Sequence, residues 1–167
     1  MIFVVHGQGA LEIGGRRVRC ALGRAGVVPA ALKREGDGAT PAGVWPLRRL
    51  LYRPDRGPAP ESRLPMRALI ATDGWCDDPA DARYNSPVAI PYPASAERLW
   101  REGSLYDRIV VLGHNDDPVV ADAGSAIFLH IATDGYAPTQ GCIALSAADM
   151  ATLLSLAGPG DALAVLP

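Results

Sequence analysis

The chain has 167 residues, with 16 Lys and Arg against 18 Asp and Glu, and a formal net charge of −2. This length suits one domain with a sizeable core, and the absence of a basic surplus argues against nucleic acid and anionic membranes as partners. No apolar run approaches the roughly 20 residues that a bilayer requires, and residues 1–6 do not resemble a signal peptide. The sequence as written therefore predicts no membrane span and a cytoplasmic location.

The first half of the chain predicts short strands separated by turns. Strand-like runs occupy residues 2–5, 11–13 and 16–22, and Gly14-Gly15 between the last two is a hairpin signal. A polar, glycine-rich loop is expected over residues 33–43 and a strand over 44–52. Residues 54–65 contain four prolines and are expected to form a surface excursion.

The second half predicts two helices among further strands. Ser95 is placed to cap a helix over residues 96–102, and Ser146 a helix over 147–157 that ends at Gly158-Pro159. Strands are expected at residues 108–112, 126–132 and 161–166. The sequence therefore predicts one domain over residues 1–167, mainly β with about two short helices, built as a β-sandwich or a rolled mixed sheet.

The three cysteines are an odd number and are widely spaced. No CxxC pair occurs, so a zinc site of that kind is not indicated, and we expect no metal and no cofactor. Cys20 lies in a predicted strand and is expected to be buried. Cys76 is followed by Asp77 and Asp78, whose negative charges raise the pKa of a thiol and make it a poorer nucleophile.

Cys142 lies where a loop meets a strand, in the stretch TQGCIAL (residues 139–145). Gly141 gives the backbone freedom that other residues lack and lets a substrate approach the main chain. Backbone N–H groups of Gly141 and Cys142 are candidates for an oxyanion hole. A cysteine with an ordinary pKa is mostly protonated at neutral pH, so this thiol needs a base nearby.

His130 is the candidate base. On a strand over residues 126–132 it shares one face with Phe128, while Ile127, Leu129 and Ile131 face the other way. The loop between His130 and Cys142 is long enough to turn back and place the two side by side. The alternative is two ordinary residues: a small buried cysteine and a structural histidine.

These residues resemble the signature of the L,D-transpeptidase catalytic domain, the YkuD-like family. That signature is a histidine on one strand followed by Ser/Thr-His-Gly-Cys-Ile/Val-Arg-Leu/Met, which His130 and residues 139–145 follow in order. Residues 37–45 (DGATPAGVW) are similar to the family's Thr-Pro hairpin, and residues 158–166 (GPGDALAVL) to its closing strand. The resemblance implies that Cys142 is the nucleophile, that His130 is its base, and that the Ile131 carbonyl orients the imidazole.

The motif departs from the family at two positions. Gln140 stands where the family usually has histidine, and Ala144 where it usually has arginine. The loop between His130 and Cys142 is also shorter than usual. Gln140 does not titrate, so the motif offers no second acid or base. The chain resembles a short, divergent member, in which Thr139 and Gln140 flank the thiol and are expected to contact substrate.

Two further stretches contain candidate site residues. His114 follows a strand and is weighed as a second pocket histidine, a turn residue or, less favoured, a metal ligand. Trp75 and Tyr84 are candidates to wall a substrate site, with Arg83 and Asn85 reaching a carboxylate or amide. The alternative for this second stretch is an ordered surface loop pinned by its aromatic residues.

Lys33, Arg34 and Asp37 lie in the glycine-rich loop. They are expected to form a solvated turn, with substrate contact as the less favoured alternative.

The resemblance implies a cysteine acyltransferase that acts on peptidoglycan stem peptides in cell wall biogenesis and cell shape. A Cys142 thioester would pass its acyl group to an amine, forming 3-3 or 1-3 cross-links. The alternatives are an L,D-carboxypeptidase or amidase acting on muropeptides, and a non-catalytic peptidoglycan-binding module. The family works in the periplasm or cell wall, which differs from the location that the sequence predicts, and we expect a monomer.

Overall fold

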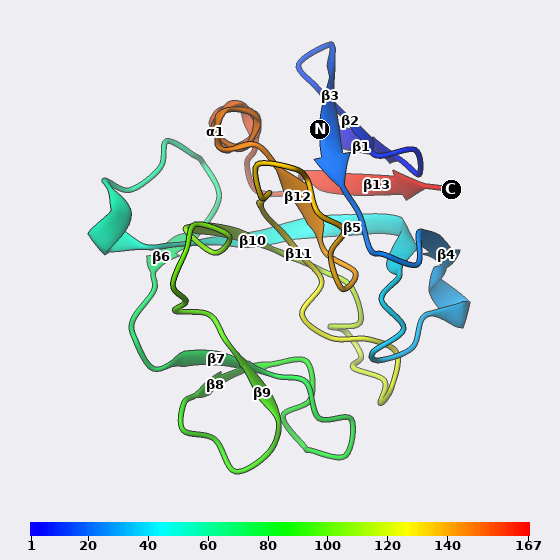
Figure 1. Cartoon of the computed structure of the whole chain (residues 1–167), viewed down its shortest axis with the longest axis vertical. Helices are drawn as coiled ribbons and strands as arrows, with labels where there is room; N and C mark the ends of the chain where they lie inside the picture. Colours follow the sequence, from blue (N-terminus) through cyan, green and yellow to red (C-terminus); the bar gives the residue numbers. More distant parts are fainter.

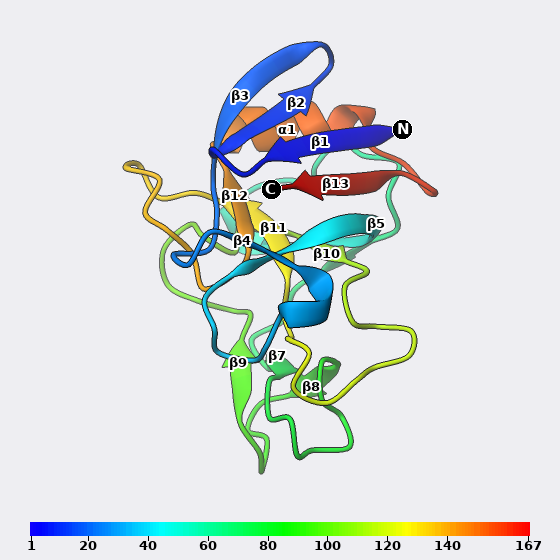
Figure 2. The same ribbon diagram turned by 90° about the vertical axis from the view of Figure 1, so that its right-hand side faces the viewer.

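The computed structural model describes residues 1–167, and eight of its strands close into a barrel. The barrel order is β10-β11-β12-β3-β2-β1-β13-β5, and β5 pairs back to β10 (Figure 1). Its strands are β1 (Ile2–His6), β2 (Ala10–Ile13), β3 (Arg16–Ala21), β5 (Thr40–Tyr52), β10 (Arg108–Leu112), β11 (Phe128–Ile131), β12 (Ile143–Leu145) and β13 (Ala162–Leu166). Two short strands, β4 (Val27–Pro29) and β6 (Met66–Ala68), add to β5 in parallel. Figure 2 shows β1, β13 and β5 as successive strands of this wall.

A separate three-stranded sheet lies at the end of the molecule away from the helix (Figures 1 and 2). It is antiparallel, in the order β8-β7-β9, and consists of β7 (Asp73–Cys76), β8 (Pro87–Ala89) and β9 (Ala96–Arg98). We call residues 69–107, which contain this sheet, the small-sheet region.

The main core fills the barrel. Its fully buried side chains come from the barrel strands and from α1 (Ala147–Leu156), which contributes Met150, Leu153 and Leu154. Ser146 caps α1 by accepting a hydrogen bond from the Asp149 N–H at 3.0 Å, as the sequence predicts. With ten residues, α1 is far too short to cross a bilayer.

A second core lies between the barrel and the small-sheet region. Side chains alternate along β10 and β11, so one set faces the main core and the other faces outward. The outward set joins side chains of the small-sheet region, and the members are Leu51, Leu69, Trp75, Leu99, Tyr106, Ile109, Val111, Ala126, Phe128 and Cys142. The predicted nucleophile is thus part of the contact between the two regions.

The prediction of a mainly β fold with a rolled sheet is confirmed, but the helix count is wrong. Residues 96–98 form β9, which pairs with β7 through Trp75 and Glu97, instead of the first turn of a helix. Here tertiary pairing overrides the local capping signal at Ser95. The structure has one α-helix and two single-turn 3-10 helices, Ala30–Leu32 and Pro54–Arg56. The loop expected over residues 33–43 is also shorter, because β5 already begins at Thr40.

Candidate active site

Cys142 is held at the entrance to β12 by a glycine that no other residue can replace without strain. Gly141 has φ of 133°, and a Cβ there would lie 2.8 Å from the Ala39 carbonyl oxygen. Positive φ and close backbone packing together require glycine at this position. The thiol that follows is therefore placed by the main chain on both sides of it.

The thiol lies between one acceptor and one donor. Its Sγ donates to the Ala126 carbonyl at 3.2 Å and accepts from the Phe128 N–H at 3.4 Å. Burial, with a smaller contribution from the Glu97 carboxylate, raises the pKa of Cys142 to about 12, although the Phe128 N–H opposes the rise. At neutral pH the resting thiol is therefore protonated, with its proton on the side of Ala126.

His130 projects from β11 on the same face as Cys142. β11 and β12 are parallel, and His130 pairs in register with Ala144, two residues beyond Cys142. His130 Nδ1 lies 2.8 Å from the Ile131 carbonyl oxygen, which can only accept, so Nδ1 carries the proton and Nε2 has a free lone pair. Burial lowers the pKa of His130, although this hydrogen bond opposes the fall, so the ring is neutral at pH 7.

The two side chains share a pocket but no hydrogen bond joins them. The pocket has a volume of about 470 Å³ and is lined by residues from the barrel, the loop before Cys142 and the small-sheet region. Five of the lining residues carry ionisable charged groups: Lys33, Glu35, Asp77, Glu97 and Arg101. For His130 to take the proton of Cys142, the Sγ–H bond must first turn away from the Ala126 carbonyl.

Lys33 is a buried member of the pocket wall and does not lie in a solvated turn. Its side chain is 3% exposed, and Nζ donates to Asp37 Oδ1 and to the Arg34 carbonyl, both at 2.7 Å. Two of its three N–H bonds are thereby used. The expectation of a solvated turn is wrong for Lys33, because the turn folds so that its ammonium group meets Asp37 and the Arg34 carbonyl.

The two candidate oxyanion donors differ. The Gly141 N–H donates to Thr139 Oγ1 at 3.1 Å, and Thr139 Oγ1 in turn donates to the Cys142 carbonyl at 2.6 Å. Thr139 thus stabilises the loop, with its hydroxyl turned to the main chain, and Gly141 has no free N–H. The Cys142 N–H makes no hydrogen bond within the protein and remains open to a ligand.

Of the predicted substrate-contacting residues, only Thr139 and Gln140 line the pocket. Trp75 and Asn85 are buried against each other, with Trp75 Nε1 donating to Asn85 Oδ1 at 2.9 Å. Tyr84 is buried, donating its hydroxyl hydrogen to Glu35 and accepting from the Gly124 N–H. Arg83 is exposed and donates to the Pro87 carbonyl. The structure thus places these four residues outside the pocket, and three of them are interior supports.

His114 also lies outside the pocket. Its Nε2 donates to the Ala123 carbonyl at 3.0 Å, its ring meets Trp45 edge-on at 4.7 Å, and Nδ1 is buried without a partner. Of the alternatives weighed for His114, the structure favours a residue of the turn region that packs internally, since it does not line the pocket. No group of three or more His, Cys, Asp or Glu side chains gathers to hold a metal.

The other two cysteines are buried away from the pocket. Burial raises the pKa of Cys20 to about 12 and is also the main cause of the raised pKa of Cys76. Neither thiol lines the pocket that contains His130, whereas Cys142 does, so Cys142 is the candidate nucleophile.

Three polar pocket residues from the small-sheet region were not identified as site residues from the sequence. Tyr106 is buried, its ring meets the His130 ring edge-on at 5.3 Å, and its hydroxyl donates to Glu97 at 2.6 Å. Arg101 donates to the same Glu97 oxygen at 3.3 Å. The sequence predicts a helix over residues 96–102, and nothing local to that stretch indicates that Glu97 and Arg101 meet at the pocket.

The comparisons with known proteins agree with this geometry. The chain matches the family model described as YkuD, L,D-transpeptidase catalytic domain, over residues 2–165, from the start of β1 into β13. No curated protein and no solved structure shows a significant match to the chain. The matched range includes Cys142, His130 and every charged group of the pocket. The chain therefore belongs to the L,D-transpeptidase catalytic domain family, whose members act on peptidoglycan.

Proposed function

We propose that this protein is a cysteine acyltransferase, an L,D-transpeptidase that acts on peptidoglycan stem peptides. The observation that carries the proposal is that Cys142 and a neutral His130 line the same pocket. The Nε2 of His130 is kept free because Nδ1 is engaged by the Ile131 carbonyl. A histidine with a free lone pair in the same pocket as a thiol is an arrangement suited to nucleophilic catalysis by cysteine.

In the first half-reaction the stem peptide enters the pocket and the Sγ–H bond turns from Ala126 toward His130. Nε2 takes the proton as Sγ attacks the peptide carbonyl carbon, forming a C–S bond. The carbonyl oxygen gains negative charge and accepts the open N–H of Cys142. The C–N bond then breaks, His130 gives its proton to the leaving amine, and a thioester remains on Cys142.

In the second half-reaction an amine from another stem peptide attacks the thioester. His130 takes a proton from the attacking nitrogen, the C–S bond breaks, and the thiolate recovers the proton. The products are a new peptide bond, which is the cross-link, and the free thiol. Water in place of the amine would give an L,D-carboxypeptidase with the same residues in the same roles.

The test incubates the purified protein with tripeptide and tetrapeptide muropeptides and follows both protein and products by mass spectrometry. We expect an acyl adduct on Cys142 and cross-linked dimers, with the dimer mass identifying a 3-3 or a 1-3 linkage. Trimmed monomers without dimers would instead indicate the carboxypeptidase. Cys142→Ala should show neither adduct nor product.

Cys20→Ala is the matched control, because Cys20 is also a buried thiol but lies in the main core away from the pocket. This variant should keep the acyl adduct. Product formation by Cys142→Ala would contradict the mechanism.

A further inference from the structure

Arg101 is the one cationic group of the pocket that keeps most of its hydrogen bonds for a ligand. The pocket is lined by three carboxylates, from Glu35, Asp77 and Glu97, and by two cations, from Lys33 and Arg101. Lys33 is neutralised by Asp37 and is 3% exposed, whereas the Arg101 side chain is 48% exposed. An anionic ligand that enters beside Cys142 therefore has one cation to meet.

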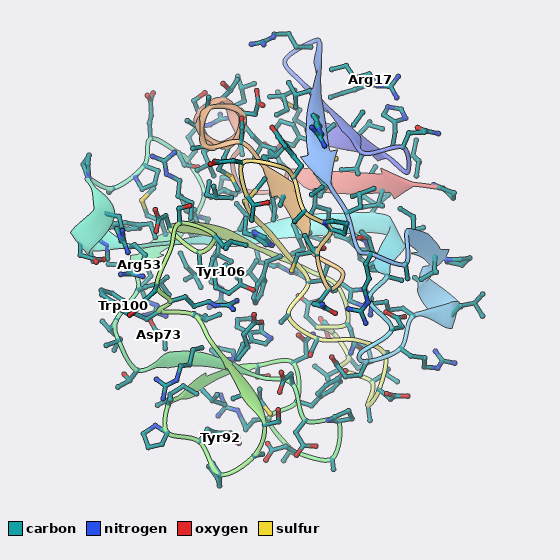
Figure 3. The ribbon with its side chains drawn as sticks, viewed as in Figure 1. Arg17, Arg53, Asp73, Tyr92, Trp100 and Tyr106 are labelled. Carbon is teal, nitrogen blue, oxygen red and sulfur yellow. The ribbon has the colours of Figure 1, made fainter.

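Arg53 holds the main chain at Arg101 in place through contacts with residues 100 and 101. Arg53 is 5% exposed, and its Nε and Nη2 each donate to an Asp55 carboxylate oxygen at 2.8 Å. Its remaining terminal nitrogen, Nη1, donates to the Arg101 carbonyl, and its guanidinium lies 3.9 Å from the centre of the Trp100 ring. Figure 3 shows Arg53 and Trp100 together at one edge of the molecule. These contacts hold residues 100 and 101 against the barrel.

The guanidinium of Arg101 is oriented by the row of side chains that leads to His130. Its Cζ lies 5.0 Å from the centre of the Tyr106 ring, and that ring lies 5.3 Å from the His130 ring. In Figure 3, Tyr106 lies nearer the centre of the molecule than Arg53 and Trp100. Arg101 donates within the pocket only through Nη1, to Glu97 at 3.3 Å. Nε, Nη2 and the second Nη1 hydrogen remain free, in the fork that suits a carboxylate.

We propose that Arg101 binds a substrate carboxylate, that of the residue which leaves when Cys142 is acylated. This inference rests on the proposed function. In a peptide whose last bond is attacked, the terminal carboxylate lies only a few bonds from the reacting carbonyl, so both fit one pocket. Glu35, Asp77 and Glu97 would repel that carboxylate, and Arg101 offsets them. The site thus favours donors that end in a free carboxylate one residue beyond the attacked carbonyl.

The test measures binding in the Cys142→Ala protein, where no acyl transfer interferes. The ligands are a tetrapeptide stem and the same peptide amidated at its terminal carboxylate, and affinities come from calorimetry. With Arg101 present, we expect the free acid to bind roughly 10- to 100-fold tighter than the amide, the range for hydrogen bonds to charged groups. Adding Arg101→Ala should bring the two affinities close together, and Arg101→Lys should keep part of the difference.

Arg98→Ala is the matched control. Arg98 is exposed on β9 and does not line the pocket, so removing it changes the net charge equally and should leave the acid-to-amide ratio unchanged. A ratio that Arg101→Ala leaves intact, equal binding of acid and amide, or no binding of the acid would each overturn the inference. The two proposals fail separately. A wild-type protein without an acyl adduct refutes acyl transfer, whereas an adduct with a ratio independent of Arg101 refutes only the carboxylate site.

Discussion

The barrel and the small-sheet region are held together by different interactions, and the pocket lies where they meet. Every barrel strand is paired on both sides by backbone hydrogen bonds, and the barrel encloses a continuous apolar core. The small sheet has three strands of three or four residues. Around these short strands, hydrogen bonds from buried polar side chains supplement the few backbone hydrogen bonds of the sheet.

Asn85 shows how the small-sheet region is held. Its Oδ1 accepts from Trp75 Nε1 and the Ala126 N–H, and its Nδ2 donates to the His114 and Asn115 carbonyls. All four hydrogen-bonding positions of this buried amide are thereby satisfied. Under the proposed function, the barrel side of the pocket would provide Cys142 and His130, and the small-sheet region would provide Arg101.

The largest expected effect is on the rate of acyl transfer, when the proposed base His130 is replaced. His130→Gln keeps a polar side chain of similar size but removes the lone pair that accepts the thiol proton. We expect the rate of acyl-enzyme formation to fall roughly 100- to 10,000-fold, the usual contribution of a general base. Intact mass spectrometry of reactions quenched at successive times measures the rate at which the acyl-enzyme forms.

Tyr106→Phe is the matched control for His130→Gln. It keeps the ring that packs on His130 and removes only the hydroxyl bound to Glu97. A loss of rate as large as that of His130→Gln would mean that the small-sheet region takes part in the chemistry itself.

The second prediction concerns stability. Leu129 is fully buried in the main core, in the middle of β11. Leu129→Ala should lower the free energy of unfolding by about 2–5 kcal/mol because it leaves a cavity in a closed barrel. Urea denaturation measures the change, and the exposed Leu166 gives a control, since Leu166→Ala should cost little. Similar losses of unfolding free energy for both variants would contradict the view that tight packing inside the barrel stabilises the fold.

The difference between the regions also explains what the sequence could predict. Polar–apolar alternation over residues 16–22 and the Gly14-Gly15 turn predicted the β2–β3 hairpin, because a strand with one buried face leaves that pattern in its own residues. β10 and β11 are almost wholly buried and are apolar runs in the sequence. His130 and Cys142 were found from their order in the chain, from Gly141 before the cysteine, and from the resemblance of residues 139–145 to the family motif. Arg101 was not found, because its role depends on Arg53 and on a strand pairing of Glu97 that no local signal contains. Asn85 was interpreted as a substrate contact for the same reason: three of its four hydrogen bonds go to residues 114, 115 and 126, far from it in sequence.

The third prediction concerns a substitution that weakens the contacts between the small-sheet region and the segment that holds the Cys142 thiol. Asn85→Ala leaves the Trp75 and Ala126 donors unpaired, and we expect a loss of about 1–3 kcal/mol. Ala126 has φ of 52° and its carbonyl accepts the Cys142 S–H. When that acceptor loosens and water enters, the pKa of Cys142 should fall. Alkylation by iodoacetamide at pH 8, measured by peptide mapping, should therefore be faster at Cys142.

Cys20 is the internal control for that experiment, because it is buried in the main core of the same molecule. Its alkylation should stay slow in Asn85→Ala. Equal acceleration at Cys20 and Cys142 would mean that the whole barrel opens and that the two regions are one cooperative unit.

The smallest effect is expected at the barrel rim, where Asp37 holds Lys33 in the pocket wall. Burial alone would raise the pKa of Asp37, but hydrogen bonds from Lys33 Nζ and from the Ala39 and Arg34 N–H groups outweigh it and lower the pKa. The folded-state pKa thus lies below the unfolded value of about 4. Asp37 therefore stabilises the fold fully above that pH, and its contribution is lost as the pH falls through the folded-state pKa.

Asp37→Asn should accordingly cost about 1 kcal/mol at pH 7, a modest value because the side chain is 25% exposed. The difference from the wild type, measured by urea denaturation, should shrink below about pH 4. Asp116→Asn is the control, since Asp116 pairs with the half-exposed Arg48 far from the pocket and should cost less. A cost at Asp37 that does not change with pH would mean that the carboxylate acts only by its shape.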